Sequence, residues 1–365
     1  MKYDYLIVGA GLFGAVMARA LTDAGKKCLV IDKKGHLGGN CYTRSEKGIS
    51  VHQYGPHVFH TNDERVWAHV NEYASFNNFV NTPKVRYQER IFSFPLNMMT
   101  FHQLWGVKTS EEARKKIEQV KEPIPNPQNI EDWCLANIGR ELYEIFIRGY
   151  TTKQWQCSPR QLPAFIIQRL PIRFTYDENY YRERFQGIPI GGYSAIFEKM
   201  LQGIDVELGM DFLKNRAGWR AKAKRMIYSG RIDEFYDYQF GDLEYRTLRF
   251  EEEWHPRSFQ GTAVMNYAEE HVPFTRIIEH KHFEFTLSED TIITKEYPET
   301  WARDKDPFYP VNNDRNNGIY EKYRALAERE DAVVFGGRLA DFKYYDMDQV
   351  IACALRMADR EKQSF

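Results

Sequence analysis

The sequence predicts a mixed α/β fold, in which a parallel α/β domain carries a helical insertion and an antiparallel β-sheet domain. A strand, a glycine-rich turn, a helix and a second strand follow one another in the first 32 residues. Another strand, turn and helix begin at residue 333. Between these ends, residues 97–170 are rich in helix formers, and short apolar stretches alternate with turns over residues 225–300. The two ends are therefore expected to build one α/β domain, and the middle is expected to be inserted into it.

The N-terminal segment has the pattern of a dinucleotide-binding turn. Apolar runs at residues 3–8 and 27–31 are typical of buried strands, and residues 15–25 between them have helical spacing. In the turn, Gly9 permits a tight bend, Gly11 lets a pyrophosphate approach the backbone, and Gly14 lets helix and strand pack closely. The helix N-terminus offers N–H groups to a phosphate, and Asp32 is placed to accept hydrogen bonds from a ribose. This context favours a dinucleotide site over an ordinary glycine-rich turn.

Two further segments favour FAD over NAD as the dinucleotide. The pair Gly38-Gly39, followed by Asn40, resembles the second flavin-contacting turn of glutathione-reductase-like FAD proteins, which NAD-only Rossmann domains lack. Near the C-terminus, Gly336-Gly337-Arg338 follows the strand at 333–335, and Asp346 is the expected N-cap of a helix over 347–358. That helix start and Arg338 can face the cofactor's phosphates. The alternative for this C-terminal piece is an ordinary strand–turn–helix unit.

The middle of the chain is expected to add two kinds of structure. Ser110 and the two acids after it indicate an N-cap for a helix over 110–121, and helical spacing resumes over 129–146. The expected organisation is a discontinuous FAD-binding domain (residues 1–80, 190–225 and 330–365), a helical lid or substrate domain (residues 96–185) and an antiparallel sheet domain (residues 81–95 and 226–329). A site at their junction is the default pocket.

Composition excludes several classes of function. The 50 Lys and Arg residues nearly balance the 51 Asp and Glu residues, so the chain lacks the excess positive charge that a nucleic-acid backbone demands. The cysteine number, 5, is odd, and no CxxC pair occurs, which indicates a reducing compartment and no zinc site. No apolar run reaches the ~20 residues that span a bilayer. We therefore expect a cytoplasmic protein without membrane insertion.

Several polar and aromatic clusters are candidates for a site. Arg169 and Arg173 flank Leu170-Pro171-Ile172, and the tyrosines Tyr180 and Tyr181 follow. Arginines of this kind can bind a diphosphate and aromatic side chains a base or a sugar ring, although each cluster alone is more often structural. His57 and His60 could be metal ligands or acid–base groups. Pro56 indicates a loop there, so a histidine that tunes a flavin is the more plausible reading.

In combination these motifs resemble one known family over nearly the whole chain. YDYLIVGAGLFGAV, GGNCYT, YGPHVFHTN, GYTTKQW, LPAFIIQRLPIRFTYD, GIPIGGY, RIIEHKHF, KEYP, FYPV and FGGRLADFKYYDM are similar to segments of bacterial-type UDP-galactopyranose mutases. The resemblance implies a homodimer that interconverts UDP-galactopyranose and UDP-galactofuranose, which supplies cell-surface polysaccharide. It also implies FAD that must be reduced, by a reductant not identified, with flavin N5 as the nucleophile on the anomeric carbon and no net redox change.

The resemblance also implies roles for individual residues. Arg169 and Arg276 look like the arginines that hold the diphosphate, and His57 looks like the histidine on the flavin face. Implied substrate contacts are Asn81, Phe146, Tyr150, Thr151, Trp155 on a mobile lid, Tyr180, Arg246, Tyr309 and Tyr344. Implied cofactor contacts are Gly9, Gly11, Phe13, Gly14, Asp32, Lys33, Gly39, Asn40, His57, Val58, Gly337, Arg338, Asp346 and Met347. No metal ligand is implied.

The resemblance has one local departure and two competing interpretations. Gln156 and Cys157 follow Trp155, where Gly and then Arg or a similar polar residue are expected, and this bears on the flexibility of the lid. One alternative is an FAD-dependent oxidoreductase of the amine-oxidase or desaturase type, and another is a non-catalytic sugar-nucleotide or FAD sensor. Two diphosphate-binding arginines would have no use in an enzyme for amines or terpenoids, which favours the mutase.

Overall fold

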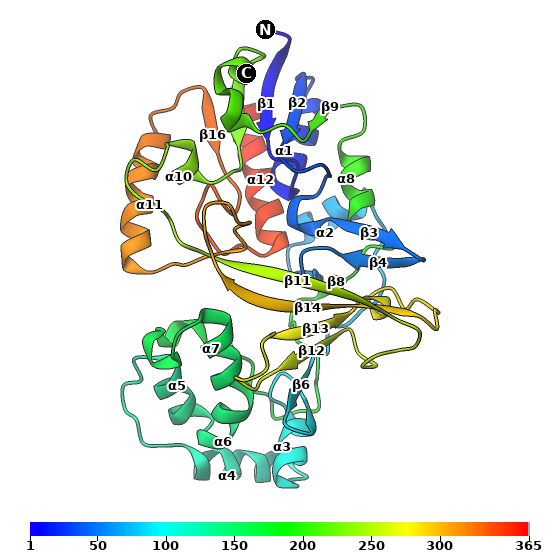
Figure 1. Ribbon diagram of the computed structural model, residues 1–365, viewed down its shortest axis with the longest axis vertical. Coiled ribbons are helices and arrows are strands. Elements are labelled where there is room, and N and C mark those ends of the chain that lie inside the picture. The colour runs from blue at the N-terminus through cyan, green and yellow to red at the C-terminus, as the bar shows by residue number, and fades with distance from the viewer. Residues whose placement is uncertain (169, 364–365) are drawn as a thin grey trace.

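The computed structural model describes residues 1–168 and 170–363, and its elements fall into three groups (Figure 1). The first is a parallel sheet at the top of Figure 1, with strand order β16-β10-β1-β2-β9. Its strands are β1 (Tyr3–Val8), β2 (Cys28–Asp32), β9 (Asp205–Leu208), β10 (Ala223–Tyr228) and β16 (Val333–Phe335). Every residue of β2 is buried, as a strand in the middle of a covered parallel sheet requires.

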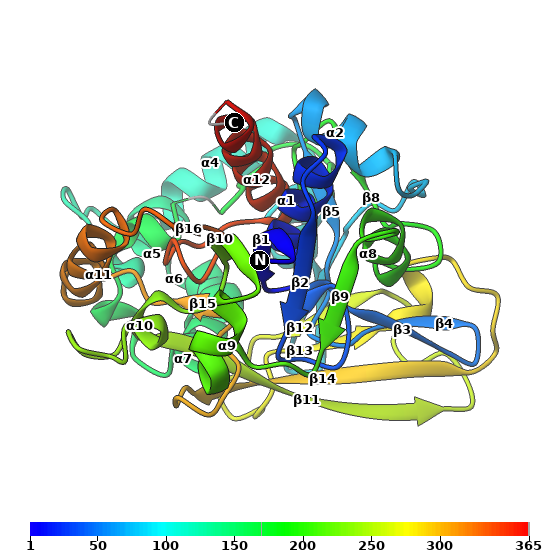
Figure 2. The ribbon, with the colours of Figure 1, turned by 90° about the horizontal axis from the view of Figure 1, so that it is seen from above.

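Helices cover both faces of this sheet. In Figure 2, α1 (Leu12–Asp23) and α12 (Met347–Lys362) lie together on one side of β1 and β10. With α8 (Ser194–Met200) they enclose one buried apolar cluster, which includes Val16, Phe197 and Ile351. On the other side, Phe212, Trp219 and Phe235 pack against Leu6 and Leu29 of the sheet. The two ends of the chain thus form one α/β unit.

The second group is a seven-stranded sheet across the middle of Figure 1, with strand order β15-β11-β14-β13-β12-β6-β7. All neighbouring pairs are antiparallel except β12 and β6, which are parallel. The strands are β6 (Lys84–Tyr87), β7 (Arg90–Ser93), β11 (Tyr245–His255), β12 (Val264–Tyr267), β13 (Arg276–Glu279), β14 (Thr291–Thr300) and β15 (Tyr309–Pro310). The apolar stretches from residue 245 to residue 300 therefore form antiparallel strands, as predicted, whereas residues 225–228 belong to β10 of the parallel sheet.

The third group is helical and lies at the bottom of Figure 1. It comprises α3 (Met98–Trp105), α4 (Ser110–Val120), α5 (Ile130–Asn137), α6 (Arg140–Leu142), a π-helical turn (Tyr143–Arg148) and α7 (Gly149–Trp155). The remaining α-helices and strands of the described residues are α2 (Glu64–Asn71), α9 (Arg216–Arg220), α10 (Ile232–Phe235), α11 (Asp314–Ala327), β3 (Thr43–Glu46), β4 (Ile49–His52), β5 (Phe59–Thr61) and β8 (Phe185–Gly187). No helix within the described ranges is both long and apolar enough to cross a membrane.

The structure refines several predicted element bounds. Thr109, and not Ser110, is the N-cap of α4: its hydroxyl accepts a hydrogen bond from the N–H of Glu112 at 3.2 Å. The helix predicted over 129–146 is interrupted at Gly139, whose φ of 79° no ordinary helix allows. The strand at 333–335 and the N-cap at Asp346 are confirmed. The three domain boundaries stay predictions; β10 runs to Tyr228, beyond the predicted end of a segment at 225.

Candidate functional site

One cavity of about 1050 Å³ touches all three groups of elements. Its wall begins at the carboxyl ends of β1, β2 and β10 and continues past β11 and β13 to α7. Ligands of open parallel α/β sheets bind at this carboxyl edge. The volume exceeds the roughly 300–1,000 Å³ typical of a site for one small molecule. The cavity therefore has room for a cofactor and a second ligand together.

The glycine-rich turn after β1 forms one end of the cavity. Gly9 has a φ of 112°, and a Cβ placed on it would lie 2.1 Å from Oγ of Ser229. Gly14 is not among the described residues of the wall; a Cβ on it would lie 1.9 Å from the carbonyl oxygen of Gly9. Gly14 thus allows α1 to pack against the turn, as its spacing predicted. Gly9, Gly11 and Phe13 line the cavity.

A second glycine turn faces the first. A Cβ on Gly39, whose φ is 55°, would lie 3.3 Å from Cα of Gly11, so the two turns pack closely against each other. Asp32 and Lys33 also line the cavity, together with Asn40 and Val58. Asp32 accepts hydrogen bonds from the N–H of Ala10 at 2.7 Å and from the N–H of Lys34 at 2.8 Å. Its carboxylate therefore holds the turn in shape at the place predicted for ribose binding.

The C-terminal unit closes this end of the cavity. Gly337, Arg338, Asp346 and Met347 line it, and the N–H of Asp346 donates to the Gln349 side chain at 2.9 Å to start α12. The Arg338 guanidinium lies 5.3 Å from the ring centre of Tyr309 and 4.8 Å from that of Tyr344. Its Nε is buried and has no hydrogen-bond partner among the described residues. An anionic group in the cavity would supply such a partner.

These features match the needs of a dinucleotide such as FAD. Two helix N-termini, at Gly11 and Asp346, meet the cavity and offer backbone N–H groups to phosphates. The glycine turns leave space for backbone approach to a pyrophosphate, and Arg338 adds a cation with an unused donor. The residues present therefore fit the predicted cofactor.

His57 lies in the wall with a defined tautomer. Its Nδ1 is 2.9 Å from the carbonyl oxygen of Gly55, which can only accept, so Nδ1 carries the proton and Nε2 keeps the lone pair. Burial lowers the pKa of His57 to about 4, and the nearby cations Arg338 and Arg276 act in the same direction. At neutral pH His57 is thus an uncharged hydrogen-bond acceptor.

Arg276 is held in the wall by a buried carboxylate. Its Nη2 is 2.9 Å from Oε1 of Glu296, a residue with no exposed surface. Burial opposes the charge of Arg276, but the attraction and hydrogen bond of Glu296, together with Tyr150 and Tyr309, outweigh it and hold the arginine's pKa well above its ordinary value. The guanidinium is therefore a permanent cation whose position is set by the protein.

The residues predicted to contact substrate line the other end of the cavity. Described members of the wall are Asn81, Phe146, Tyr150, Thr151, Trp155, Tyr180, Arg246, Tyr309 and Tyr344. Tyr309 and Tyr344 stack with ring centres 5.2 Å apart, and the Arg246 guanidinium lies 5.7 Å from the Trp155 ring. Burial raises the pKa of Tyr150 to about 12, so its hydroxyl keeps its proton at neutral pH. This end presents aromatic rings and cations together.

Gln156, the position that departs from the expected glycine, ends α7. Its φ is 53°, in the left-handed region that a glycine would occupy without strain. The side chain compensates by accepting a hydrogen bond from the Thr300 hydroxyl at 2.8 Å, which ties the end of α7 to the last residue of β14. The segment after Trp155 is therefore anchored at its start.

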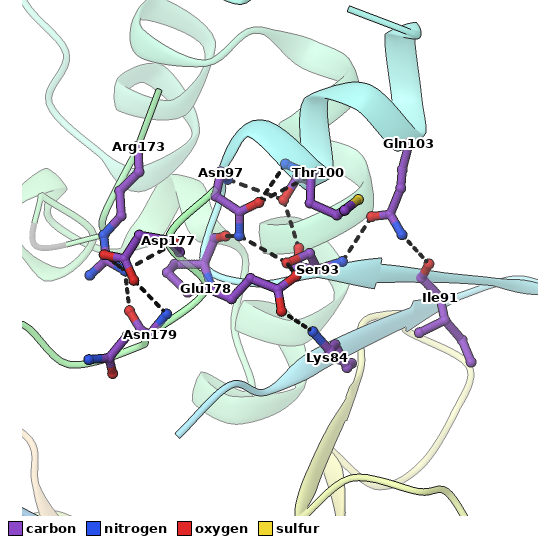
Figure 3. Close-up of polar contacts among 12 residues, drawn as sticks. Lys84, Ile91, Ser93, Asn97, Thr100, Gln103, Arg173, Asp177, Glu178 and Asn179 are labelled. Atoms are coloured by element: carbon purple, nitrogen blue, oxygen red, sulfur yellow. Dashed lines mark hydrogen bonds and ion pairs between the residues drawn. The ribbon is translucent and has the colours of Figure 1, made fainter. Parts of the chain in front are cut away.

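The structure describes one of the two arginines that flank Pro171. Arg169 lies outside the described residues, so its role stays a prediction. Arg173 is described but is not among the described residues of the wall; only 6% of its surface is exposed. Figure 3 shows that it turns back to bind the carboxylate of Asp177 and the carbonyl oxygen of Asn179. Arg173 thus shapes the segment that leads to Tyr180.

A neighbouring network in Figure 3 fixes the same segment to the second sheet. The carboxylate of Glu178 accepts from Nζ of Lys84 at 2.9 Å and from Oγ of Ser93 at 2.6 Å. The N–H of Tyr180 then donates to the carbonyl oxygen of Asn81 at 2.8 Å. Asn81 and Tyr180, distant in sequence, are thereby placed side by side in the wall of the cavity.

Comparison with known proteins agrees with this geometry. Residues 145–344 match the family described as UDP-galactopyranose mutase, and residues 7–73 match the NAD(P)-binding Rossmann-like domain. The chain is 43% identical over 363 residues to a probable UDP-galactopyranose mutase of Klebsiella pneumoniae, covering 98% of this chain and 94% of that protein. The chain belongs to the UDP-galactopyranose mutase family. It is thus an enzyme of the isomerase class that depends on a flavin, which sets aside the oxidoreductase and sensor interpretations.

Two other similarities refine the family assignment. A dTDP-fucopyranose mutase of Escherichia coli is 40% identical over 364 residues, covering 97% of each chain. The crystal structure of a reduced UDP-galactopyranose mutase superposes with a TM-score of 0.75 at 14% identity, covering 100% of this chain and 96% of that one. The structural match supports the fold. The fucopyranose mutase shows that relatives of this chain at 40–43% identity are named for different nucleotide sugars.

Several residues that line this cavity were not predicted from the sequence. Lys34, Gln154, Ser229 and Asn266 line it as well. Ser229 follows β10, and its hydroxyl donates to the carbonyl oxygen of Val8 at 2.9 Å. A signal existed for Ser229: once 223–228 is recognised as a parallel strand, the residues after it must lie at the carboxyl edge. Gln154 lies within the GYTTKQW motif but was assigned no role there, and Asn266 carries no comparable pattern in the sequence.

Proposed function

We propose that this enzyme interconverts UDP-galactopyranose and UDP-galactofuranose with bound, reduced FAD. The observation that carries the proposal is the single cavity, which has a dinucleotide cradle at one end and Arg276, Arg246 and aromatic side chains at the other. A flavin in the cradle and a sugar diphosphate beside Arg276 would then share one enclosed space. The family assignment supports the same reaction.

The reaction breaks and later remakes the bond between C1 and UDP, and it exchanges the C1–O5 ring bond for a C1–O4 bond. When bound and reduced, the flavin supplies an electron-rich nitrogen as nucleophile for the anomeric carbon. The C1–O bond to UDP breaks, and its electron pair leaves on the diphosphate. The C1–O5 ring bond then opens and O5 takes up a proton, while the 4-hydroxyl gives up its proton and closes a five-membered ring as a C1–O4 bond. UDP returns to C1 as the bond between C1 and the nucleophile breaks. Substrate and product are isomers, so no electrons are gained or lost overall.

Fixed cations supply the electrostatic part of catalysis. Charge develops on the diphosphate as the C1–O bond breaks, and Arg276, oriented by Glu296, is placed to stabilise it. Arg246 is a second cation of the same wall, and Arg169 is proposed as a third from the sequence. Burial strengthens these interactions because little water remains to screen them.

Uncharged groups complete the proposed site. His57 presents an acceptor nitrogen, and the stacked pair Tyr309 and Tyr344 presents a flat aromatic surface under Arg338. We assign His57 to the flavin face and the tyrosines, with Asn81 and Tyr180, to the nucleotide sugar. Phe146, Tyr150, Thr151 and Trp155, which come from the π-helical turn and α7, are assigned to the nucleoside and to closure over it.

A second substrate deserves a direct test because of the dTDP-fucopyranose mutase at 40% identity. Thymidine diphosphate lacks the ribose 2′-hydroxyl and adds a methyl group to the base, and fucose has a methyl group at C6 where galactose has a hydroxymethyl group. A site built to hydrogen-bond a hydroxyl rejects the analogue without it by a factor of about 10⁴–10⁵. The ratio of kcat/KM for the two substrates therefore decides between them.

The test is turnover of both nucleotide sugars by the purified protein, separated by HPLC. With dithionite-reduced protein we expect conversion of UDP-galactofuranose to UDP-galactopyranose, and a kcat/KM above that for dTDP-fucofuranose. Oxidised protein serves as the control and should be inactive. Conversion of the dTDP sugar alone would transfer the assignment to the fucose reaction, and equal activity with oxidised flavin would refute the need for reduction. The homodimer and the cytoplasmic location stay predictions.

A further inference from the structure

Both backbone groups of His57 are bound by buried side chains. The N–H of His57 donates to Nδ1 of His52 at 3.2 Å, and the carbonyl oxygen of His57 accepts from the hydroxyl of Tyr193 at 3.1 Å. His52 comes from β4 and Tyr193 from the N-cap of α8, so two distant elements meet at one residue of the cavity wall. The exposed fractions are 1% for His52 and 2% for Tyr193.

His52 is fixed in one tautomer. Because Nδ1 accepts from an N–H group, the ring proton is on Nε2. Burial first, and then the neighbouring rings His280 and His57, hold the pKa of His52 well below its ordinary value, so the ring stays neutral. A stack on Phe283, with ring centres 4.5 Å apart, and an edge contact with Tyr193 at 5.7 Å leave the ring little freedom.

A second histidine extends this support to the antiparallel sheet. Nδ1 of His280 accepts from the N–H of His52 at 3.2 Å, and its Nε2 lies 2.7 Å from the hydroxyl of Thr294 on β14. His280 is 1% exposed. Neither His52, His280 nor Tyr193 is among the described residues of the cavity wall. Their contacts therefore reach the cavity through His57.

We propose that His52 and Tyr193 are positioning residues that clamp the His57 backbone and so set the environment of the bound flavin. The inference rests on the proposed function, because it takes a flavin to lie beside His57. With both backbone groups held, and Nδ1 tied to Gly55, the acceptor Nε2 of His57 has one position. A fixed acceptor next to a cofactor biases its protonation and its electronics, and a group held loosely does so less.

The test compares Tyr193→Phe with Tyr143→Phe in the flavin-loaded protein. Both tyrosines are almost fully buried, and the hydroxyl of Tyr143 donates to Glu131 at 2.9 Å in the helical group; neither Tyr143 nor Glu131 is among the described residues of the cavity wall. Each substitution removes one oxygen and one hydrogen bond. The bond of Tyr143 goes to a carboxylate, so Tyr143→Phe should lose at least as much stability as Tyr193→Phe. Only Tyr193→Phe should shift the visible absorption bands and the reduction potential of the flavin, with kcat about 10-fold lower and KM little changed.

A pair of substitutions at His52 separates position from packing. In His52→Asn the amide oxygen replaces Nδ1 as the acceptor for the N–H of His57, whereas His52→Leu fills the space without an acceptor. We expect the asparagine variant to keep a flavin spectrum and potential close to wild type and the leucine variant to change both. Circular dichroism and thermal unfolding show which variants fold.

The experiments distinguish a failure of the clamp from a failure of the proposed function. Wild-type protein that binds no flavin, or that converts no nucleotide sugar, would end the proposed function irrespective of these variants. If wild type is active and flavin-loaded, but Tyr193→Phe and His52→Leu fold with unchanged flavin spectrum and potential, the clamp is overturned. Equal shifts in Tyr193→Phe and Tyr143→Phe would also overturn it, because the effect would then follow general loss of stability.

Discussion

Glu296 orients Arg276 at the cavity wall through a 2.9 Å contact between Oε1 and Nη2. The carboxylate is fully buried, and its other oxygen, Oε2, has no hydrogen-bond partner among the described residues. The arginine side chain keeps 21% of its surface exposed. A buried carboxylate so placed fixes the direction of the guanidinium before any ligand arrives, which is the preorganisation that electrostatic catalysis needs.

Arg276→Ala should lower kcat/KM by a factor on the order of 10²–10³, as does loss of one donor to a developing anion. The physical reason is that the departing diphosphate would lose a permanent cation held in a partly buried site. Steady-state kinetics with reduced protein measure the effect. Arg249→Ala is the matched control, since Arg249 pairs with Glu299 on an exposed part of β11. Near-normal turnover of Arg276→Ala would remove this residue from the proposed machinery.

Glu296→Gln should lower the free energy of unfolding by about 1.5–3 kcal/mol, the contribution of a hydrogen bond to a charged group. Saturating UDP should narrow the difference from wild type, because a diphosphate gives the unpaired guanidinium a new partner. Urea unfolding with and without UDP measures both effects. The control Glu299→Gln, in an exposed pair with Arg249 and Lys305, should cost under about 1 kcal/mol. If UDP leaves the difference in free energy of unfolding between Glu296→Gln and wild type unchanged, a diphosphate does not bind at Arg276.

The N-terminal glycines should separate folding from cofactor binding. In Gly14→Ala the new Cβ would lie 1.9 Å from the carbonyl oxygen of Gly9, so the free energy of unfolding should fall by about 1–3 kcal/mol or more. In Gly11→Ala the Cβ would be 3.8 Å from Cα of Gly39, an ordinary contact, so folding should be nearly unaffected. The methyl group would still enter the space kept for a pyrophosphate, and flavin affinity should fall by about tenfold or more. Flavin fluorescence titration and urea unfolding measure the two effects, and wild-type affinity in Gly11→Ala would argue against a pyrophosphate there.

The sequence predicted the parts of the fold that depend on local pattern. The first parallel strand, the glycine turn and the C-terminal strand and helix have strong apolar periodicity and clear end signals, such as Asp346 before α12. The strand β10 carries the weaker pattern AKRMIY, in which only part of the residues are apolar, and it becomes a strand because β1 and β16 pair with it on both sides. Tertiary pairing of this kind leaves no local signal.

The candidate site was predictable where a motif resembles a known one, and less so elsewhere. Arg173 shows the limit: from sequence it is equivalent to any arginine beside a proline, and only the fold reveals that it binds Asp177 and the carbonyl oxygen of Asn179. The clamp on His57 shows the same limit, because His52, Tyr193 and His280 come from three separate elements. Polar groups that are distant in sequence meet only because of the topology of the fold, and the topology cannot be inferred from the local patterns of one sequence.

Substitutions at Gln156 should expose the energy stored at the end of α7. Gln156→Ala keeps the left-handed backbone but loses the hydrogen bond from Thr300, so the free energy of unfolding should fall by about 1 kcal/mol. Gln156→Gly loses the same bond but relieves about 1 kcal/mol of backbone strain, so its stability should stay near wild type. Urea unfolding of both variants measures the two contributions, the hydrogen bond and the backbone strain. Thr300→Val is the partner substitution in a double-mutant cycle that isolates the hydrogen bond. A glycine variant as unstable as the alanine variant would show that the backbone stores no strain.

Acid should destabilise the protein through its buried histidines. Burial lowers the pKa of His57 to about 4 and that of His280 to about 3, against an ordinary value of 6.5. Between these values the unfolded chain binds more protons than the folded one, so the free energy of unfolding falls as pH falls below 6.5. Each such group contributes a slope of about 1.4 kcal/mol per pH unit.

The His280 contribution to this slope can be isolated by substitution. In wild type, unfolding between pH 5 and 6 takes up close to one proton at His280. His280→Gln should remove that proton, so the free energy of unfolding should depend less steeply on pH, whatever the effect of the substitution on absolute stability. Urea unfolding across that window measures the slope. His271→Gln, at an exposed position on the surface, is the matched control for the substitution itself. An unchanged slope in His280→Gln would mean that His280 is protonated equally in both states, and would contradict its neutral role as the acceptor for the N–H of His52.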